Sequence, residues 1–94
     1  MKHIPAFLII NAVRYTIGRQ SYAVGEICMW LKDNWEDIDP NVRRIIHRDI
    51  DDELKHEKRY NQIRNNDEPF SFFGQDIDRK RWMEIRNLPI KDAN

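Results

Sequence analysis

Two histidine–carboxylate pairs stand at helical spacing in the middle of the chain, where they could bind a metal ion. His47 precedes Asp51 by four residues, and Asp52 precedes His56 by four. Side chains four residues apart on a helix are neighbours, so each pair could supply two ligands to a metal-dependent hydrolase. A catalytic zinc ion needs three protein ligands, and His3 is the only further histidine. Solvated ion pairs are the better interpretation, and we predict no metal site.

The chain offers little for nucleophilic catalysis or for phosphate binding. Cys28 is the only cysteine, and it falls in the apolar stripe of an expected helix, where burial disfavours the reactive thiolate. Ser21 is explained as the N-cap of that helix. The three glycines are isolated, so the sequence has no glycine-rich phosphate loop. We therefore predict a binding protein, not an enzyme, with no catalytic residue and no cofactor.

Arginine, glutamine and tyrosine side chains cluster where the first helix is expected to end, and large apolar side chains follow on the second. Guanidinium groups beside aromatic rings are typical of phosphate and base recognition. Aromatic and methionine side chains outside the main apolar stripe of a helix are typical of a protein interface. The predicted binding residues are Arg14, Tyr15, Arg19, Gln20, Tyr22, Met29 and Trp30.

Each half of this predicted site has an alternative explanation. Arg14 projects from an otherwise apolar helix and could instead be a structural residue that pairs with Glu26 or Asp49. The apolar patch on the second helix could be covered by the end of the chain, which would complete a single core. The residues that could cover it are Phe70, Phe72, Phe73 and Trp82.

Charged residues elsewhere suggest two further binding modes. Arg43, Arg44 and Arg48 occupy neighbouring positions of an expected helix, and together with Arg14 and Arg19 they could contact a nucleic-acid backbone. Nucleic-acid binding is therefore the alternative function. A group of acids could instead present a DNA-mimicking surface to a basic groove of a host protein, although a solvated helix end is the simpler explanation. These acids are Asp33, Glu36, Asp37 and Asp39.

Length and composition limit these interpretations. A chain of 94 residues fits one domain with a single modest core. The formal net charge is +0 with 34% charged residues, so any nucleic-acid contact needs a local basic patch. The apolar run 4–13 is shorter than the roughly 20 residues that span a bilayer. One cysteine excludes an internal disulfide and suits a reducing compartment, so we expect a cytoplasmic protein without a membrane partner.

Apolar periodicity and helix punctuation predict an all-α bundle of about four helices. The first helix is apolar on nearly every side, which predicts a buried central helix that Gly18 ends. Asp39 with Pro40, and later Asp78, are the expected starts of the third and fourth helices. The aromatic loop should fold back on the core, with a short strand at 70–73 as the alternative. The predicted helices are 5–17, 22–37, 40–63 and 79–86, with a loop at 65–77 and a loose tail at 91–94.

Two short motifs resemble those of small, mostly uncharacterised proteins encoded by tailed phages and prophages. The first motif is Arg14-Tyr15-x-x-Gly18-Arg19-x-Ser21-Tyr22-x-Val24 followed by Trp30-Leu31, and the second is Gly74-x-Asp76-x-Asp78-x-x-x-Trp82. The resemblance implies no activity. It implies binding to a host enzyme, a defence system or the phage's own replication and assembly proteins. We therefore predict a phage accessory protein that binds a host or phage protein in the host cytoplasm, for instance as an inhibitor, or that forms a homodimer.

Overall fold

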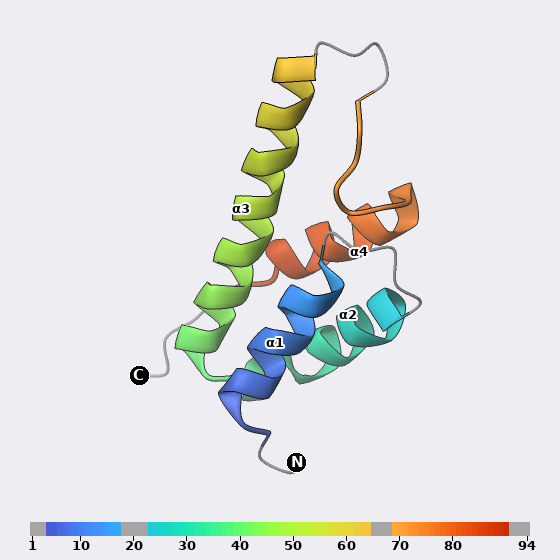
Figure 1. Cartoon of the computed structure of the whole chain (residues 1–94). Coiled ribbons are helices and arrows are strands. Elements are labelled where there is room, and N and C mark those ends of the chain that lie inside the picture. The colour runs from blue at the N-terminus through green and yellow to red at the C-terminus, as the bar shows by residue number, and fades with distance from the viewer. Residues whose placement is uncertain (1–3, 18–22, 65–68, 91–94) are drawn as a thin grey trace.

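The described part of the chain forms four α-helices and one 3-10 turn, and Figure 1 shows how the labelled helices are arranged. This computed structural model describes residues 4–17, 23–64 and 69–90, and these contain no β-strand. The predicted all-α bundle is confirmed, although the predicted tail 91–94 lies outside the described residues. The elements are α1 (Ala6–Thr16), α2 (Ala23–Asn34), η1 (Trp35–Asp37), α3 (Pro40–Arg64) and α4 (Asp76–Arg86).

The start of α3 follows from its first residues. Asp39 Oδ1 accepts a hydrogen bond from the backbone N–H of Asn41 at 2.7 Å. Pro40 at the first helical position has no N–H, and that N–H would otherwise stay unpaired at a helix start. The predicted helix 40–63 therefore agrees with the observed one to within one residue at its end.

The predicted start of α4 is three residues too late. Gly74 has φ 83°, in the left-handed region that favours glycine, and Gln75 is the N-cap. Asp76 and Asp78 both lie in the first turn, where the positive end of the helix dipole stabilises a carboxylate. Asp78 is thus not the N-cap, and its Oδ1 instead accepts a hydrogen bond from Arg81 Nη1 at 2.8 Å.

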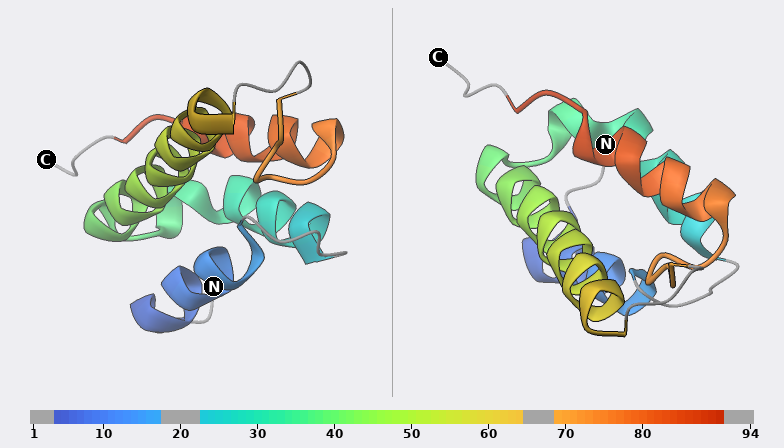
Figure 2. Two further views of the ribbon diagram at one scale, coloured as in Figure 1. Left: turned by 45° about the horizontal axis from the view of Figure 1, so that its top comes forward. Right: turned by 90° about the horizontal axis from the view of Figure 1, so that it is seen from above.

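The helices surround one core, and α2 has neighbours on two sides. In the left view of Figure 2, α2 lies between α4 and α1, with α3 crossing beside them. α2 contacts both α4 and α1, and α3 contacts α1 and α4. All four helices, η1 and the segments between them contribute buried apolar side chains. These are Val13, Ile17, Val24, Cys28, Leu31, Trp35, Ile38, Val42, Ile46, Ile50, Phe73, Trp82 and Ile85.

The prediction that the first helix is buried and central is wrong. Only Val13 and Thr16 of α1 are buried, whereas Phe7, Leu8 and Tyr15 are 62%, 50% and 66% exposed. α1 lies at the edge of the bundle, where α2 and α3 contact it (Figure 2). Because no further described helix covers the outer side of α1, a second apolar side faces outward.

α1 ends before the glycine that was expected to end it. Ile17 is already extended, with φ −66° and ψ 136°, and its N–H donates to the Val13 carbonyl at 2.8 Å. Gly18 and the predicted N-cap Ser21 lie outside the described residues. The extended conformation of Ile17 alone is enough to stop the helix.

The phenylalanine-rich segment 69–75 folds back on α3, as predicted. Phe73 is buried, with 1% of its surface exposed. Asn61 of α3 binds the backbone of Phe70 twice, accepting from its N–H at 2.8 Å and donating to its carbonyl at 2.9 Å. The alternative of a strand at 70–73 is wrong, because a side chain of α3 holds this backbone where a second strand would be needed.

Candidate functional site

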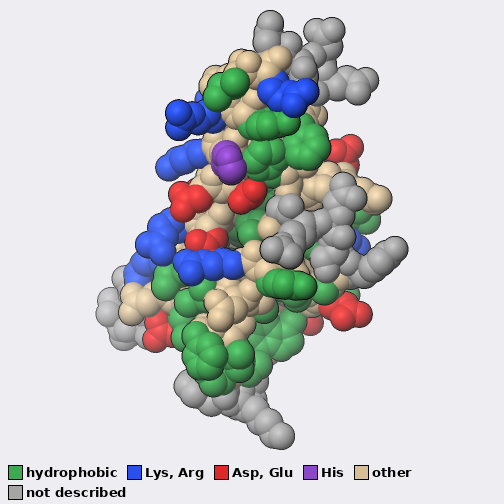
Figure 3. Space-filling view, in the orientation of Figure 1, with side chains coloured by type: hydrophobic (Ala, Val, Ile, Leu, Met, Phe, Trp, Pro, Cys, Tyr) green, Lys and Arg blue, Asp and Glu red, His purple; other side chains and the backbone are tan. Residues whose placement is uncertain are grey.

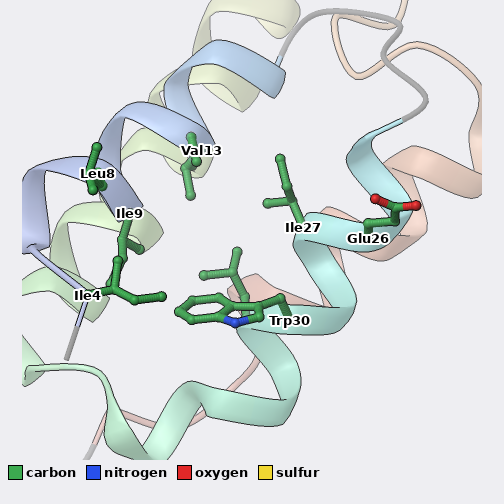
Figure 4. Close-up of a pocket in the computed structure, with 9 residues that line it drawn as sticks. Ile4, Leu8, Ile9, Val13, Glu26, Ile27 and Trp30 are labelled. Carbon is green, nitrogen blue, oxygen red and sulfur yellow. The ribbon is translucent and has the colours of Figure 1, made fainter. Parts of the chain in front are cut away.

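A groove of about 340 Å³ lies between α1 and α2, and its exposed lining is almost wholly apolar. In Figure 4, Val13 of α1 and Ile27 of α2 face each other across the groove, while Trp30 lies close to Ile4 and Ile9 at one end. Trp30 is half-buried and packs against the core. The lining residues are Ile4, Leu8, Ile9, Ala12, Val13, Glu26, Ile27, Trp30 and Leu31.

A second hollow of about 360 Å³ adjoins the first, and Ile4 and Ile9 line both. It lies between the start of α1 and the chain that joins η1 to α3. Its apolar floor includes Ile38, and two carboxylates, Asp37 and Asp39, stand at its border. We call these two adjoining hollows together the trough, and Asp37 and Asp39 stand at its edge.

The outward side of α1 is a row of large apolar side chains beside this trough. Ile4, Phe7, Leu8 and Tyr15 are 36%, 62%, 50% and 66% exposed. Phe7, Leu8 and Tyr15 fall on one side of α1, and Ile4 directly precedes the helix. Figure 3 shows hydrophobic side chains gathered at the lower end of the molecule, where α1 begins. We call these four exposed side chains the α1 surface.

The structure brings together only part of the binding patch predicted on α2. Trp30 lines the α1–α2 groove, whereas Met29 is 65% exposed and lines a different hollow between α2 and α4. Neighbouring helical residues differ by about 100° in direction, so Met29 and Trp30 lie on different sides of α2. Tyr22, Arg19 and Gln20 lie outside the described residues. The segment 70–73 and Trp82 leave Met29 exposed, so they do not cover this residue as the alternative prediction required.

Arg14 forms an ion pair with an acid of another helix, which was one of its two predicted roles. Its Nε donates to Asp49 Oδ2 at 2.9 Å, and its Nη2 lies 3.4 Å from Asp49 Oδ1. The hydrogen bond with Asp49 and the charge of that carboxylate raise the pKa of Arg14. Tyr15, the next residue, belongs to the α1 surface. The predicted pair with Asp49 is confirmed, and α1 contributes apolar side chains to the site in place of an arginine.

The predicted arginine group on α3 is divided by the fold. Arg43 is buried, with 7% exposure, and its Nε donates to the Ile38 carbonyl at 2.9 Å. Arg44 and Arg48 are exposed. The prediction that Arg43 contacts nucleic acid is wrong, because its guanidinium holds the chain that leads into α3. Arg48 lies on the surface, and Arg44, which is also exposed, donates to Asn41 Oδ1 at 3.0 Å.

The groups that could have carried catalysis have structural roles. Burial raises the pKa of the Cys28 thiol to about 12, so the reactive thiolate is scarce at neutral pH. His47 Nε2 lies 2.9 Å from the Ile85 carbonyl, and Asp51 accepts a hydrogen bond from Arg86 Nε at 2.6 Å. The described residues contain no group of three or more His, Cys, Asp or Glu side chains that could hold a metal ion. Of the described helices, none is at once long enough and apolar enough to cross a membrane.

His47 is expected to make the stability of the fold depend on pH. Its ring stacks on Trp35 at 5.1 Å between centroids, and burial lowers its pKa although the Ile85 carbonyl opposes this. The unfolded chain then binds more protons than the folded chain, so the free energy of unfolding rises with pH in this range. We expect the contribution of neutral His47 to the free energy of unfolding to be fully present above the unfolded histidine pKa of about 6.5. This contribution should be lost as the pH falls below that value.

Urea unfolding at about pH 7 and about pH 5.5 measures this effect, because these two pH values lie on either side of the ordinary histidine pKa. His47→Gln should reduce the loss of stability between the two pH values, because it removes the titrating ring but keeps a hydrogen-bond donor. His56→Gln replaces an exposed histidine and is the matched control, which should keep the loss seen in the native chain. An equal loss in native protein and His47→Gln would contradict the assignment.

Comparisons with known proteins leave the function to be argued from this geometry. No protein-family model, curated protein or solved structure matches the chain. The resemblance to small phage proteins therefore stays a prediction, together with the host context and the partner class that it implies.

Proposed function

We propose that this chain is a non-enzymatic protein that works by binding another protein at the α1 surface and the adjoining groove. The exposed apolar side of α1 carries this proposal. Monomeric proteins rarely keep large apolar side chains together on their surface unless a partner covers them. Aromatic and large aliphatic side chains next to a pocket are also what the buried centre of a protein interface contains.

The resemblance to small phage proteins supports the same class of function, since it implies action by binding. We propose a host or phage protein as the partner, with inhibition of that protein as one outcome of binding. A second copy of this chain is the other candidate, in which case the α1 surfaces of two protomers would cover each other. Both forms require Phe7 and Leu8 to be exposed in the free chain, as they are.

Capture of proteins from host cells tests this proposal when it is made with matched variants. Phe7→Glu and Leu8→Glu place a charge in the α1 surface, and Ile63→Glu places the same charge at an apolar residue of α3 that is 75% exposed. We expect native protein and Ile63→Glu to retain the same partner, and the two α1 variants to lose it with unchanged helix content. Equal capture by all four proteins, together with a monomeric mass in solution, would contradict the proposal.

One further observation favours nucleic-acid binding as the second candidate function. The outer side of α3 carries five exposed cations and one exposed acid, Asp52, within one helical stripe. A row of cations along a helix can follow a phosphate backbone. This row replaces the predicted group that included Arg43. Its cations are Arg44, Arg48, Lys55, Lys58 and Arg59.

Fluorescence anisotropy with a labelled single-stranded or duplex oligonucleotide tests the second candidate. Removing a cation that touches one phosphate lowers the slope of log affinity against log salt by about 0.7 to 0.9. We therefore expect Arg48→Glu with Lys55→Glu to lower the slope by roughly twice that amount. Lys80→Glu, an exposed cation of α4, should leave the slope unchanged. Absence of binding by the native chain at low salt would remove nucleic acid from consideration.

A further inference from the structure

We infer that the element seated in the trough beside α1 is an amphipathic helix of the partner that carries lysine or arginine next to its apolar face. This inference rests on the proposed function and adds the chemistry of the partner. The first reason is the shape of the site. Two hollows of about 340 and 360 Å³ share Ile4 and Ile9, so the apolar floor is elongated. An elongated apolar trough is the form of site that receives one side of a helix.

The second reason is the charge at the edge of the trough. All the charged residues that line the two hollows are acids, namely Glu26, Asp37 and Asp39. All three are exposed, and no described lysine or arginine forms an ion pair with any of them. Carboxylates at the edge of an apolar site attract a partner of opposite charge and repel an acidic one. The occupant should therefore be basic along its edges.

The spacing of these acids fits a helical occupant. Glu26 lies in the first turn of α2, and Asp37 ends η1. Along α2 the rise from Glu26 to Asn34 is on the order of 12 Å, which is about two turns of a helix, and η1 then continues the chain to Asp37. A partner helix of this length can place apolar side chains at i, i+4 and i+7 in the trough and basic side chains at both ends.

A second copy of this chain satisfies these requirements less well. The exposed element that another protomer would supply is α1, and Arg14 is its single cation. Arg14 is already paired with Asp49 of α3. A dimer formed through α1 would therefore bury apolar surface but leave Glu26, Asp37 and Asp39 without compensating charge, whereas a basic helix supplies both.

Selection from a ribosome-display library tests the chemistry of the occupant. The library holds amphipathic peptides with a fixed apolar side and a polar side randomised among Lys, Arg, Glu, Gln and Ser. The native full chain is the bait. In a counter-selection step, peptides that also bind the Leu8→Glu variant are discarded, because they do not bind in the trough. We expect the selected peptides to carry an excess of Lys and Arg on the randomised side. Neutral or acidic winners that Leu8→Glu fails to bind would overturn the charge assignment and leave the proposed function standing.

The best selected peptide then tests two of the three acids, Glu26 and Asp37, directly by fluorescence anisotropy. We expect Glu26→Lys with Asp37→Lys to weaken its binding roughly tenfold at low salt, with the difference shrinking as salt rises. Asp52→Lys with Glu84→Lys makes the same change in net charge away from the trough and should bind as the native chain does. Equal weakening by both double variants would show a long-range charge effect and overturn the role of these acids.

The remaining outcomes separate this inference from the proposed function. Selection of no peptide overturns the helical occupant, while capture of a host protein that Phe7→Glu loses would still support the proposed function. A dimer in sedimentation equilibrium that Leu8→Glu converts to a monomer would make the second copy the occupant. That result overturns the inference and keeps the α1 surface as the binding site.

Discussion

Trp82→Ala is expected to destabilise the fold by about 3 to 5 kcal/mol, the usual loss for removing a buried tryptophan side chain. Trp82 is fully buried, and Trp82 and Ile85 are the buried residues by which α4 enters the core. A domain of this size has a total stability of about 5 to 15 kcal/mol, so this one change removes much of it. Urea unfolding followed by circular dichroism measures the loss.

Ile77→Ala is the matched control, because Ile77 lies on the same helix but is 53% exposed. Substitutions at such surface positions usually change stability by less than about 0.5 kcal/mol. A similar loss in both variants would contradict the assignment of Trp82 as the main anchor of α4 in the core, because the exposed Ile77 makes no such contact.

Trp82→Phe separates the packing of this side chain from its polar atom. The indole Nε1 of Trp82 is buried without a hydrogen-bond partner among the described residues. A buried donor left unpaired costs about 1 to 3 kcal/mol, which partly offsets the packing of the ring. We therefore expect Trp82→Phe to lose much less than Trp82→Ala, about 1 kcal/mol or less, since it removes the unpaired donor together with part of the ring. A loss as large as that of Trp82→Ala would show that the indole N–H is satisfied in solution.

The elements of this fold could be predicted because their signals are local. Asp39 and Pro40 fix the start of α3 within a few residues of chain, and the apolar spacing of α2 identifies the side that is buried. Trp82 and Ile85 could be assigned to the core because α4 carries few other apolar residues. Each of these features depends on residues that are neighbours in the sequence.

The position of α1 could not be predicted in the same way. Its composition is apolar on two sides, and burial of both sides depends on how many other helices are present to cover them. The bundle places α2 and α3 against α1, so Phe7 and Leu8 face outward. A helix that is apolar all round in a chain with few partner helices is therefore also a signal of an interface. That interpretation would have identified the α1 surface from the sequence. The predicted cluster around Arg14 and Trp30 lies only at the edge of this surface.

Contacts between residues far apart in the sequence also could not be predicted from the spacing of residue types. Arg79 follows the first turn of α4, which already carries the acids Asp76 and Asp78, so its neighbours in the sequence do not show which partner it has. The structure explains Arg79 by a partner 22 residues earlier, Glu57 of α3, whose carboxylate receives Arg79 Nη1 at 2.6 and 2.8 Å. The Glu57 side chain is only 11% exposed, although a glutamate usually lies on the surface.

Glu57→Ala is expected to destabilise the fold by about 2 to 3 kcal/mol, much more than removal of an ordinary surface acid. Glu57 Oε2 also accepts the backbone N–H of Phe72 at 2.9 Å, so one carboxylate joins α3, the segment 69–75 and α4. Its loss leaves a part-buried backbone donor and a half-buried guanidinium without their acceptor. Urea unfolding measures the change, and faster chymotrypsin cleavage at Phe70 or Phe72 should accompany it.

Two comparisons decide whether this carboxylate joins the three elements or only adds charge. Glu84→Ala breaks the ion pair between Glu84 and Lys32, two side chains that are 59% and 58% exposed. This variant should lose less than about 1 kcal/mol of stability. Glu57→Gln keeps an acceptor for the Phe72 N–H and should fall between Glu57→Ala and the native chain. If Glu57→Ala and Glu84→Ala destabilise the fold equally, the Glu57 carboxylate does not join the three elements, and α3 and α4 are held together by their other contacts, such as the Asp51–Arg86 pair.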